Sequence, residues 1–146
     1  MKPFDTTRPG QTAELSFTID LRHAPEKVWR ALTDPVLLAQ WLLPVVDLTL
    51  KPGAPFRYQG QPHPGWDGIV NCRILAIDAP RMLSYAWVVG EMDTVVTFTI
   101  EPIASGTRLV LVHSGFKQQN QQNFGGARYG WMMMGGKLSD LLASVS

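Results

Sequence analysis

The sequence contains a single cysteine, Cys72, among its 146 residues. An intrachain disulfide framework is therefore excluded, and a reducing compartment is the simplest expectation. Charged residues are also scarce, at 17% of the chain, and the formal net charge is only +1. Lysine and arginine form no cluster along the chain. This composition gives no support to nucleic-acid binding, which depends on a basic surface.

Long apolar runs are missing as well. No stretch approaches the roughly 20 apolar residues that span a bilayer, so we expect no membrane insertion. The first ten residues contain no apolar segment of the kind found in signal peptides. From these two features we expect a cytoplasmic protein.

The chain is instead rich in large apolar side chains. Hydrophobic residues make up 45% of it, and it holds five tryptophans and six methionines. A chain of this length is expected to form one domain with a sizeable core. The excess of tryptophan in a sequence of low charge predicts additional apolar surface, either lining a cavity or forming a partner interface.

The N-terminal third changes from one hydrophobic period to another. We interpret residues 1–11 as a flexible arm and residues 12–146 as a single domain. Over residues 13–22 apolar and polar side chains alternate, which is typical of a strand with one wet face. Helical spacing follows over residues 24–44, divided at Asp34-Pro35 because a residue before proline avoids the helical region. We therefore expect two short helices after the first strand.

Six further strand-like segments precede a helical C-terminal part. The strands are expected over residues 46–50, 54–59, 66–78, 82–89, 93–102 and 107–114. From Phe124 onward apolar residues step by three and four, which predicts one long helix. Gly130, Gly135 and Gly136 interrupt its apolar stripe. Glycines inside a helix indicate close backbone approach, a bend, or room for a bound group.

Seven segments in this order resemble the START-like SRPBCC superfamily and, within it, the homologues of the activator of the 90-kDa heat-shock-protein ATPase. The resemblance spans residues 13–143 and ends with Gly130-Trp131 and Leu138. Its motifs are PEKVWRALTDP at 25–35, QWLLP at 40–44, DLTLKPG at 47–53, GIV at 68–70, IDAPRMLSYAW at 77–87, TVVTF at 94–98 and GTRLVLVHSGF at 106–116.

The resemblance implies an α+β helix-grip fold, in which a curved antiparallel sheet of about six to seven strands surrounds the long C-terminal helix. It implies that a hydrophobic or amphipathic small molecule binds in a cavity between the sheet and this helix, with no cofactor. One alternative is an enzyme similar to the cyclases and aromatases of polyketide pathways. Another is a co-chaperone-like domain acting on a heat-shock ATPase, which we do not expect because no second chaperone-docking module is present.

Ten residues are candidates for lining this cavity. They are large or apolar side chains on the later strands and the long helix, with one histidine: Trp66, Tyr85, Trp87, Phe98, Leu111, His113, Phe124, Trp131, Met134 and Leu138. For each aromatic, ordinary core packing is the alternative, since such a side chain buries a large area in any fold.

Three consecutive methionines, Met132 to Met134, cannot all lie on one helical face. We expect one or two of them at a partner surface or at the cavity mouth, where flexible thioethers adapt to irregular shapes. Together with Leu42 and Leu43 they leave apolar side chains to cover, and a homodimer is one way to cover them.

His113 shares its strand face with Leu109 and Leu111, so it is expected to point toward the concave side of the sheet. One interpretation is a polar group in a cavity, which anchors a ligand, as the hydroxyl of Tyr85 would, or acts as a base near neutral pH. The second is a buried histidine that is hydrogen-bonded to the backbone near the end of the strand. No acidic residue lies obviously beside it to tune it as a base.

Covalent chemistry and metal binding find little support in the sequence. The three histidines and Cys72 lack any recognisable ligand spacing, so we expect no metal site. No nucleophile–base pair can be assigned, and we therefore expect binding rather than catalysis.

Overall fold

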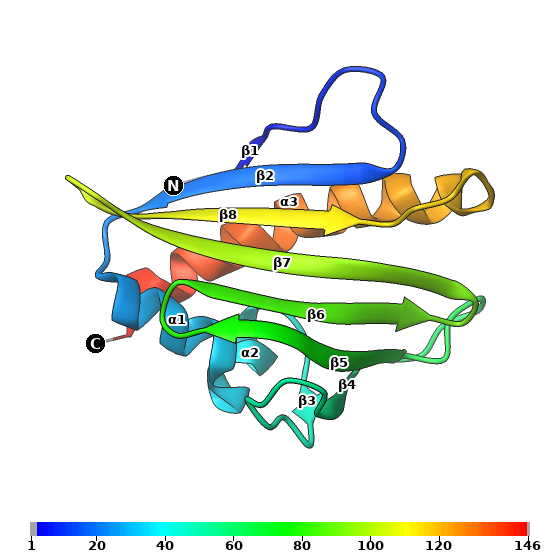
Figure 1. The fold of residues 1–146 in the computed structure, drawn as a ribbon, viewed down its shortest axis with the longest axis horizontal. Helices are drawn as coiled ribbons and strands as arrows, with labels where there is room; N and C mark the ends of the chain where they lie inside the picture. Colours follow the sequence, from blue (N-terminus) through cyan, green and yellow to red (C-terminus); the bar gives the residue numbers. More distant parts are fainter. Residues whose placement is uncertain (1–2, 146) are drawn as a thin grey trace.

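The computed structural model describes residues 3–145, which form one eight-stranded antiparallel sheet and three α-helices. The strand order is β1-β2-β8-β7-β6-β5-β4-β3. Helix α3 crosses one face of the sheet, and α1 and α2 lie together at one end of it (Figure 1). The elements are β1 Phe4–Asp5, β2 Glu14–Leu21, α1 Pro25–Thr33, α2 Pro35–Trp41, β3 Val45–Val46, β4 Pro55–Gln59, β5 Ile69–Asp78, β6 Met82–Val89, β7 Met92–Ile103, β8 Gly106–Ser114, the 3₁₀ turn η1 Gln118–Asn120 and α3 Gln121–Ser144.

This architecture is the α+β helix-grip fold that the sequence predicted. The sheet has one strand more than the seven expected segments because β1, which contains only two residues, was not predicted. Two residues are too few to produce an alternating pattern, so such strands leave no periodic signal in a sequence.

The N-terminal segment differs from the expected flexible arm over residues 1–11. Phe4 and Asp5 pair with the otherwise free edge of β2. The Asp5 carboxylate also accepts a hydrogen bond of 2.6 Å from Nε of Arg128 on α3. An edge strand presents unpaired backbone groups, and these can pair with a short segment whatever its side chains are. The side-chain pattern of residues 4–5 therefore did not predict this pairing.

The predicted strand over residues 46–50 is wrong in extent. Only Val45 and Val46 pair with β4, and Asp47 follows with a φ of 63°. This left-handed conformation, which aspartate tolerates better than most residues, ends the strand. The loop between β3 and β4 is therefore longer than the gap of residues 51–53 between the two expected strands.

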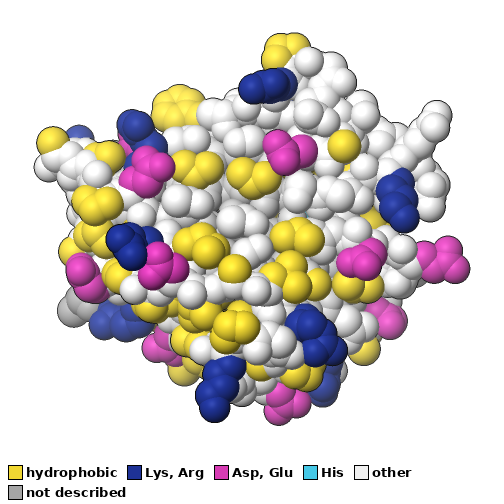
Figure 2. Space-filling view, in the orientation of Figure 1, with side chains coloured by type: hydrophobic (Ala, Val, Ile, Leu, Met, Phe, Trp, Pro, Cys, Tyr) yellow, Lys and Arg dark blue, Asp and Glu magenta, His cyan; other side chains and the backbone are white. Residues whose placement is uncertain are grey.

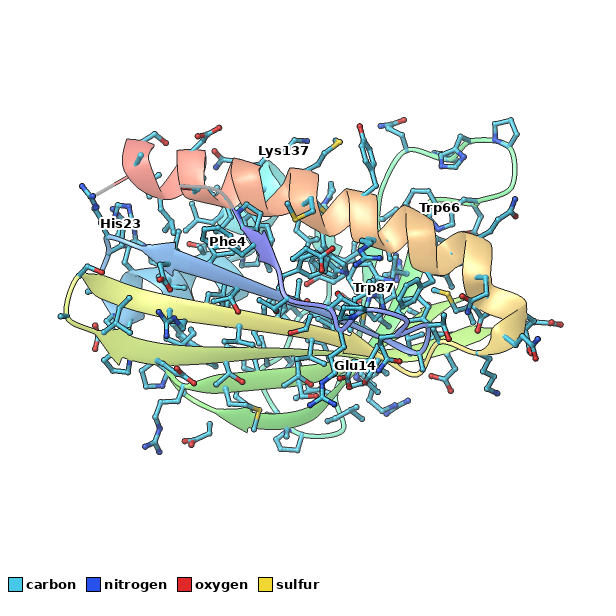
Figure 3. The ribbon with its side chains drawn as sticks, turned by 90° about the horizontal axis from the view of Figure 1, so that it is seen from above. Phe4, Glu14, His23, Trp66, Trp87 and Lys137 are labelled. Atoms are coloured by element: carbon cyan, nitrogen blue, oxygen red, sulfur yellow. The ribbon has the colours of Figure 1, made fainter. Side chains whose placement is uncertain are left out.

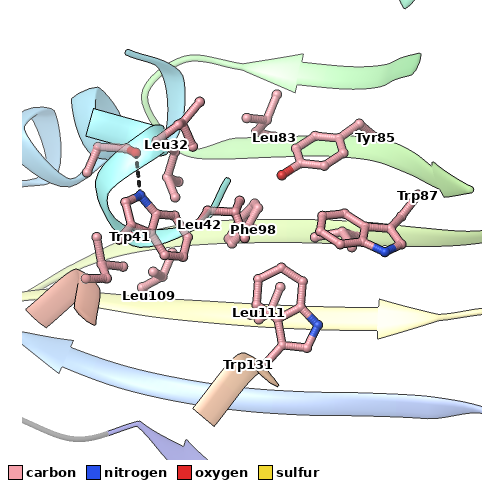
Figure 4. Packing of buried hydrophobic residues seen from close by; sticks show 14 of the residues in the cluster. Leu32, Trp41, Leu42, Leu83, Tyr85, Trp87, Phe98, Leu109, Leu111 and Trp131 are labelled. Carbon is pink, nitrogen blue, oxygen red and sulfur yellow. Dashed lines mark hydrogen bonds between the residues drawn. The ribbon is translucent and has the colours of Figure 1, made fainter. Parts of the chain in front are cut away.

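The two short helices close one end of the grip. The Asp34 side chain accepts a hydrogen bond from the backbone N–H of Val36 and so caps α2 directly after α1 ends. The indole of Trp41 donates to the backbone carbonyl of Ala31 at 2.8 Å, which joins the two helices, as the dashed line in Figure 4 shows. Trp41 then packs edge-on against Phe98 of β7, with ring centroids 6.4 Å apart.

The interior under the C-terminal half of α3 is filled. Phe98, Leu111 and Leu138 meet Trp41 and Trp131 there, and the void between them measures only about 10 Å³. A space of this size holds at most one water molecule. The ligand cavity expected between the sheet and the helix is therefore absent from this half of the interface.

Pro3 closes the seam between α3 and β2. It is buried and lines the same small void as Gly135. A Cβ atom placed on Gly135 would lie 2.8 Å from Cγ of Pro3 and 3.2 Å from Cδ1 of Ile19. This glycine therefore serves close approach, one of the three roles that the sequence left open.

The outer face of the sheet mixes charges of both signs with apolar side chains. Figure 2 shows lysines and arginines separated from one another over this face, with acidic residues between them. Two ion pairs on the sheet are Arg108 with Asp20 and Arg81 with Asp78. No broad basic area is present on the face shown.

Alanine substitutions at Gly135 and Gly136 form a matched pair that tests how closely Pro3 packs against α3. Gly136→Ala is expected to raise the free energy of unfolding by about 1 kcal/mol, because alanine is the better helix former and a Cβ at 136 meets nothing within 4 Å. Gly135→Ala is expected to lose this gain, since its Cβ collides with Pro3. Urea unfolding of both variants measures the difference, and equal gains would contradict the close packing of Pro3.

Candidate functional site

A cavity of about 570 Å³ opens at the end of the sheet opposite α1 and α2. Its volume lies in the range of small-molecule sites. The N-terminal half of α3, the loop of residues 61–67 and the adjoining ends of β5 to β8 surround it. Its lining consists of Leu43, His63, Pro64, Gly65, Trp66, Val70, Trp87, Val89, Met92, His113, Gln122, Asn123, Gly126, Ala127, Gly130, Trp131 and Met134.

The cavity has a buried floor and an exposed mouth. Trp87, His113 and Trp131 form the floor and are 8%, 1% and 3% exposed. The mouth is formed by exposed residues of the 61–67 loop and by Gln122 and Asn123 in the first turn of α3. Figure 3 shows the loop that carries Trp66 beside the N-terminal half of α3, with Trp87 on the sheet side of the same helix.

Two glycines of α3 create the room. A Cβ atom on Gly126 would meet nothing within 4 Å, and one on Gly130 would meet only Cε of Met134, at 3.6 Å. Both glycines line the cavity. Larger side chains at these positions would occupy the space between α3 and the sheet, so Gly130 borders open space and is not in close contact with a neighbouring backbone.

The 61–67 loop is held at its base by a second pair of glycines. The backbone N–H of Gly60 donates to the carbonyl of Gly68 at 2.7 Å. Gly68 has a φ of +86°, and a Cβ atom there would lie 2.6 Å from the carbonyl oxygen of Gly60. Only glycine fits at 68, and the tight base projects the loop toward α3.

Within this loop Trp66 and His63 present their rings to the cavity. Their backbones exchange two hydrogen bonds of 2.9 and 3.0 Å, and their ring centroids lie 5.5 Å apart. The indole of Trp66 donates to the carbonyl of Ile69 at 3.2 Å. The expected strand over 66–78 therefore begins later, at Ile69, because Trp66 belongs to the loop.

A chain of hydrogen bonds fixes the floor. The Trp131 indole N–H donates to Nδ1 of His113 at 2.9 Å. The Thr94 hydroxyl donates to the backbone carbonyl of Trp87 at 2.7 Å, so it can only accept from Nε2 of His113, also at 2.7 Å. These directions assign the proton of the neutral imidazole to Nε2.

His113 is held neutral by this environment. Burial lowers its pKa from 6.5 to about 3. A proton added at Nδ1 would also face the N–H of Trp131, which has no lone pair to offer. With both nitrogens engaged, His113 offers neither a free base nor a free acid. It is the buried, hydrogen-bonded histidine of the second interpretation, but its partners are the side chains of Thr94 and Trp131 and not the backbone.

The floor tryptophans pack closely around this histidine. Trp87 and Trp131 have ring centroids 5.4 Å apart, and their centroids lie 5.7 and 5.9 Å from that of His113. Phe116 also packs against the imidazole, with ring centroids 4.5 Å apart and the rings tilted by 55°. The floor is therefore a rigid aromatic surface (Figure 4).

The structure brings half of the predicted site residues to the cavity. Five of them line it: Trp66, Trp87, His113, Trp131 and Met134. The other five are buried away from it: Tyr85, Phe98, Leu111, Phe124 and Leu138. Core packing, the stated alternative for large apolar side chains, is what the structure shows for these five.

Tyr85 is not an anchor for a ligand in this cavity. Its hydroxyl shares a hydrogen bond of 2.8 Å with that of Tyr58, behind Trp87. Burial raises the pKa of both phenols, and it raises the pKa of the neighbouring Cys72 thiol to about 12. All three groups are therefore protonated near neutral pH and belong to the core.

Several lining residues could not be recognised from sequence patterns. Gln122, Asn123 and Gly126 stand in a polar stretch that reads equally well as a loop or helix entry. His63 lies in a segment whose composition indicates only a loop. Of the three methionines, Met132 and Met133 are exposed and Met134 lines the cavity, as expected from their helical positions.

Residues 3–145 contain no group of three or more His, Cys, Asp or Glu side chains placed to hold a metal ion. Among the same residues no helix is long and apolar enough to cross a membrane. The homodimer stays a prediction.

A curved sheet gripping one long helix, with an apolar cavity at one end of the grip, defines the class of START-like SRPBCC proteins. Within this class the chain belongs to the family described as activator of Hsp90 ATPase homolog 1-like protein, which it matches over residues 22–143. No curated protein matches the sequence.

Solved structures of similar proteins agree with this family. Protein MLL2253 from Mesorhizobium loti is 33% identical, with a TM-score of 0.83 over 91% of this chain and 98% of that one. CalU16 from Micromonospora echinospora is 24% identical, with a TM-score of 0.73 over 97% and 83% of the two chains. DynU16, from the dynemicin biosynthetic locus, is 19% identical, with a TM-score of 0.76 over 92% and 48%. The last two show the fold alone.

The assignment of His113 predicts a specific loss of stability in acid. Unfolded His113 binds a proton below about pH 6.5, whereas folded His113 binds one only near pH 3. The unfolded state binds more protons between these values, so the free energy of unfolding falls as pH decreases through this interval, by at most about 1.4 kcal/mol per pH unit. Urea unfolding at pH 7.5 and 5 measures the loss.

His113→Gln is expected to reduce this pH dependence, while the control His63→Gln removes an exposed histidine outside the network and is expected to keep it. Equal dependence in the wild type and His113→Gln would contradict the assignment. Trp131→Phe offers a second measurement, because it removes the donor that faces Nδ1 and is expected to raise the pKa of His113, followed by NMR.

Proposed function

We propose that this protein binds a hydrophobic or amphipathic small molecule in the cavity between the N-terminal half of α3, the 61–67 loop and the sheet, without covalent chemistry. The observation that carries the proposal is the construction of the cavity. Gly126 and Gly130 leave a space of about 570 Å³ above a floor of buried aromatic side chains. An apolar ligand in this cavity would remove its own apolar surface and that of the exposed lining from water, which favours binding by about 25 cal/mol per Å².

The position of the space supports binding over mere imperfect packing. In the other half of the same helix–sheet interface the remaining void measures only about 10 Å³. Glycine costs a helix about 1 kcal/mol relative to alanine, so each glycine that faces the cavity carries a cost in stability. A cavity of this kind, open at a mouth with polar groups, is the usual form of a ligand site.

The chemistry of the lining supports non-covalent binding. His113, the residue with the clearest catalytic potential, has both nitrogens engaged and stays neutral. Cys72 is buried, with a raised thiol pKa, and does not line the cavity. A buried cavity floor without a nucleophile beside a free base favours a binding protein over an enzyme, and the other histidine of the lining, His63, lies in the exposed loop at the mouth.

A ligand from natural-product metabolism is consistent with the similarity to DynU16, which comes from the dynemicin biosynthetic locus. This similarity is one of fold and does not specify a particular compound. The co-chaperone alternative has no observation of this structure in its favour, and we do not propose it.

Filling the cavity tests the proposal. Nile red, an uncharged solvatochromic dye, is expected to bind the wild type saturably with a blue-shifted emission. Gly126→Leu places a side chain in the cavity and is expected to weaken binding by about tenfold or more. The dissociation constant is measured by fluorescence titration.

Gly125→Leu is the matched control. It makes the same substitution at the preceding position of α3, which is exposed, outside the cavity lining and free of neighbours within 4 Å. It is expected to keep wild-type affinity. Absence of saturable binding to the wild type, or equal affinity of the two variants, would overturn the proposal.

A further inference from the structure

We propose that the cavity selects uncharged, flat ring compounds that carry a hydrogen-bond acceptor, and that the indole N–H of Trp87 is the donor that recognises this acceptor. The inference rests on the proposed function and narrows its ligand class. It excludes anionic amphiphiles such as fatty acids as preferred ligands.

The first argument is the absence of charge. None of the lining residues is Asp, Glu, Lys or Arg. Two charged groups close to them in the sequence are engaged elsewhere: Arg128 donates to Asp5, and Asp67 accepts from the backbone N–H of Ile69. A charged group drawn into the cavity would lose hydration without meeting an opposite charge, which is strongly unfavourable.

The second argument concerns the polar atoms of the walls. The indole N–H of Trp131 is occupied by His113, and that of Trp66 is occupied by the carbonyl of Ile69. Both nitrogens of His113 are occupied as well. These side chains therefore offer a ligand only ring faces and edges, which suit flat ring systems.

Within the buried floor Trp87 is the exception; the other histidine of the lining, His63, lies in the exposed loop at the mouth. Its side chain is more than nine-tenths buried in the floor, yet no residue of the described chain accepts a hydrogen bond from its Nε1. No buried polar side-chain atom among these residues lacks a partner, so Nε1 keeps some exposed surface, and Trp87 faces the cavity. An indole nitrogen donates and does not accept, so its complement is a carbonyl, ether or hydroxyl oxygen.

The shape of the site agrees with a rigid ligand. The rings of Trp87 and Trp131 are held by packing and by the hydrogen bonds of their neighbours, so they lose little freedom on binding. A flat ring compound also loses fewer rotatable bonds than an acyl chain of the same volume. Gln122 and Asn123 at the mouth provide neutral amides for any further polar group.

Three probes with one ring system test the charge and acceptor requirements together. They are 2-acetylnaphthalene, 2-isopropenylnaphthalene and 2-naphthoate, each competed against Nile red at pH 7.5. The ketone is expected to bind about tenfold more tightly than the carboxylate and several-fold more tightly than the alkene. A carboxylate that binds as tightly as the ketone, or an alkene equal to it, overturns the inference.

Trp87→Phe keeps an aromatic floor and removes the donor. It is expected to abolish the preference for the ketone over the alkene while the alkene keeps its affinity within about twofold. An unchanged preference for the ketone would assign recognition of the acceptor to another group and overturn the role of Trp87.

A new positive charge tests the argument from charge independently. Gln122→Lys is expected to improve 2-naphthoate binding about tenfold, whereas Gln119→Lys adds the same charge at an exposed position outside the lining and is expected to have little effect. Equal effects of the two substitutions would contradict the argument. If Nile red itself does not bind, the proposed function fails; if it binds but the carboxylate competes best, only this inference fails.

Discussion

The hydrogen bond from the Trp131 indole to His113 ties the long helix to the sheet, and much else in the molecule is arranged around it. It lies where the closely packed half of the interface meets the open half. On one side Phe98, Leu111 and Leu138 fill the interior; on the other, Gly126 and Gly130 leave the cavity empty of side chains. From His113 the chain of bonds continues through Thr94 to the backbone of Trp87, so one neutral network links α3 with β8, β7 and β6.

Such a network constrains each member to one role. Thr94 must accept from the imidazole and donate to the carbonyl, which valine of the same shape cannot do. His113 must remain uncharged, because its second nitrogen faces a donor. The low polarity that surrounds these groups strengthens their bonds and makes any unpaired member costly. A floor built in this way is stiff, and this stiffness explains why the residue that looked most like a catalyst acts as a support.

Most of the fold could be predicted from the sequence, because alternation and helical spacing report which side of an element is buried. The alternation of side chains in β8 predicts which of them, including His113, point inward. Helical spacing and the Asp34-Pro35 boundary predict the two short helices. Position along a face cannot be predicted in the same way. Tyr85 and Trp87 lie on one side of the same strand, yet only Trp87 reaches the cavity.

The difference between these two residues arises from tertiary structure. It depends on where α3 packs closely against the sheet and where its glycines leave space. It also depends on the 61–67 loop, which forms one wall of the cavity and has no periodic sequence pattern. The pairing of β1 with β2 could not be predicted for a related reason: it depends on backbone hydrogen bonds, which leave no pattern in the side chains. Family membership likewise defines the architecture and does not specify the chemistry of the cavity lining.

The buried position of Pro3 bears on how the protein should be handled in the laboratory. An affinity tag joined on the N-terminal side of Pro3 would lie next to a proline that packs between α3 and β2. The helix that such a tag could disturb is the one that holds Trp131 over the cavity. A purification handle at the other terminus, where α3 ends beyond the packed half of the grip, leaves this wedge untouched.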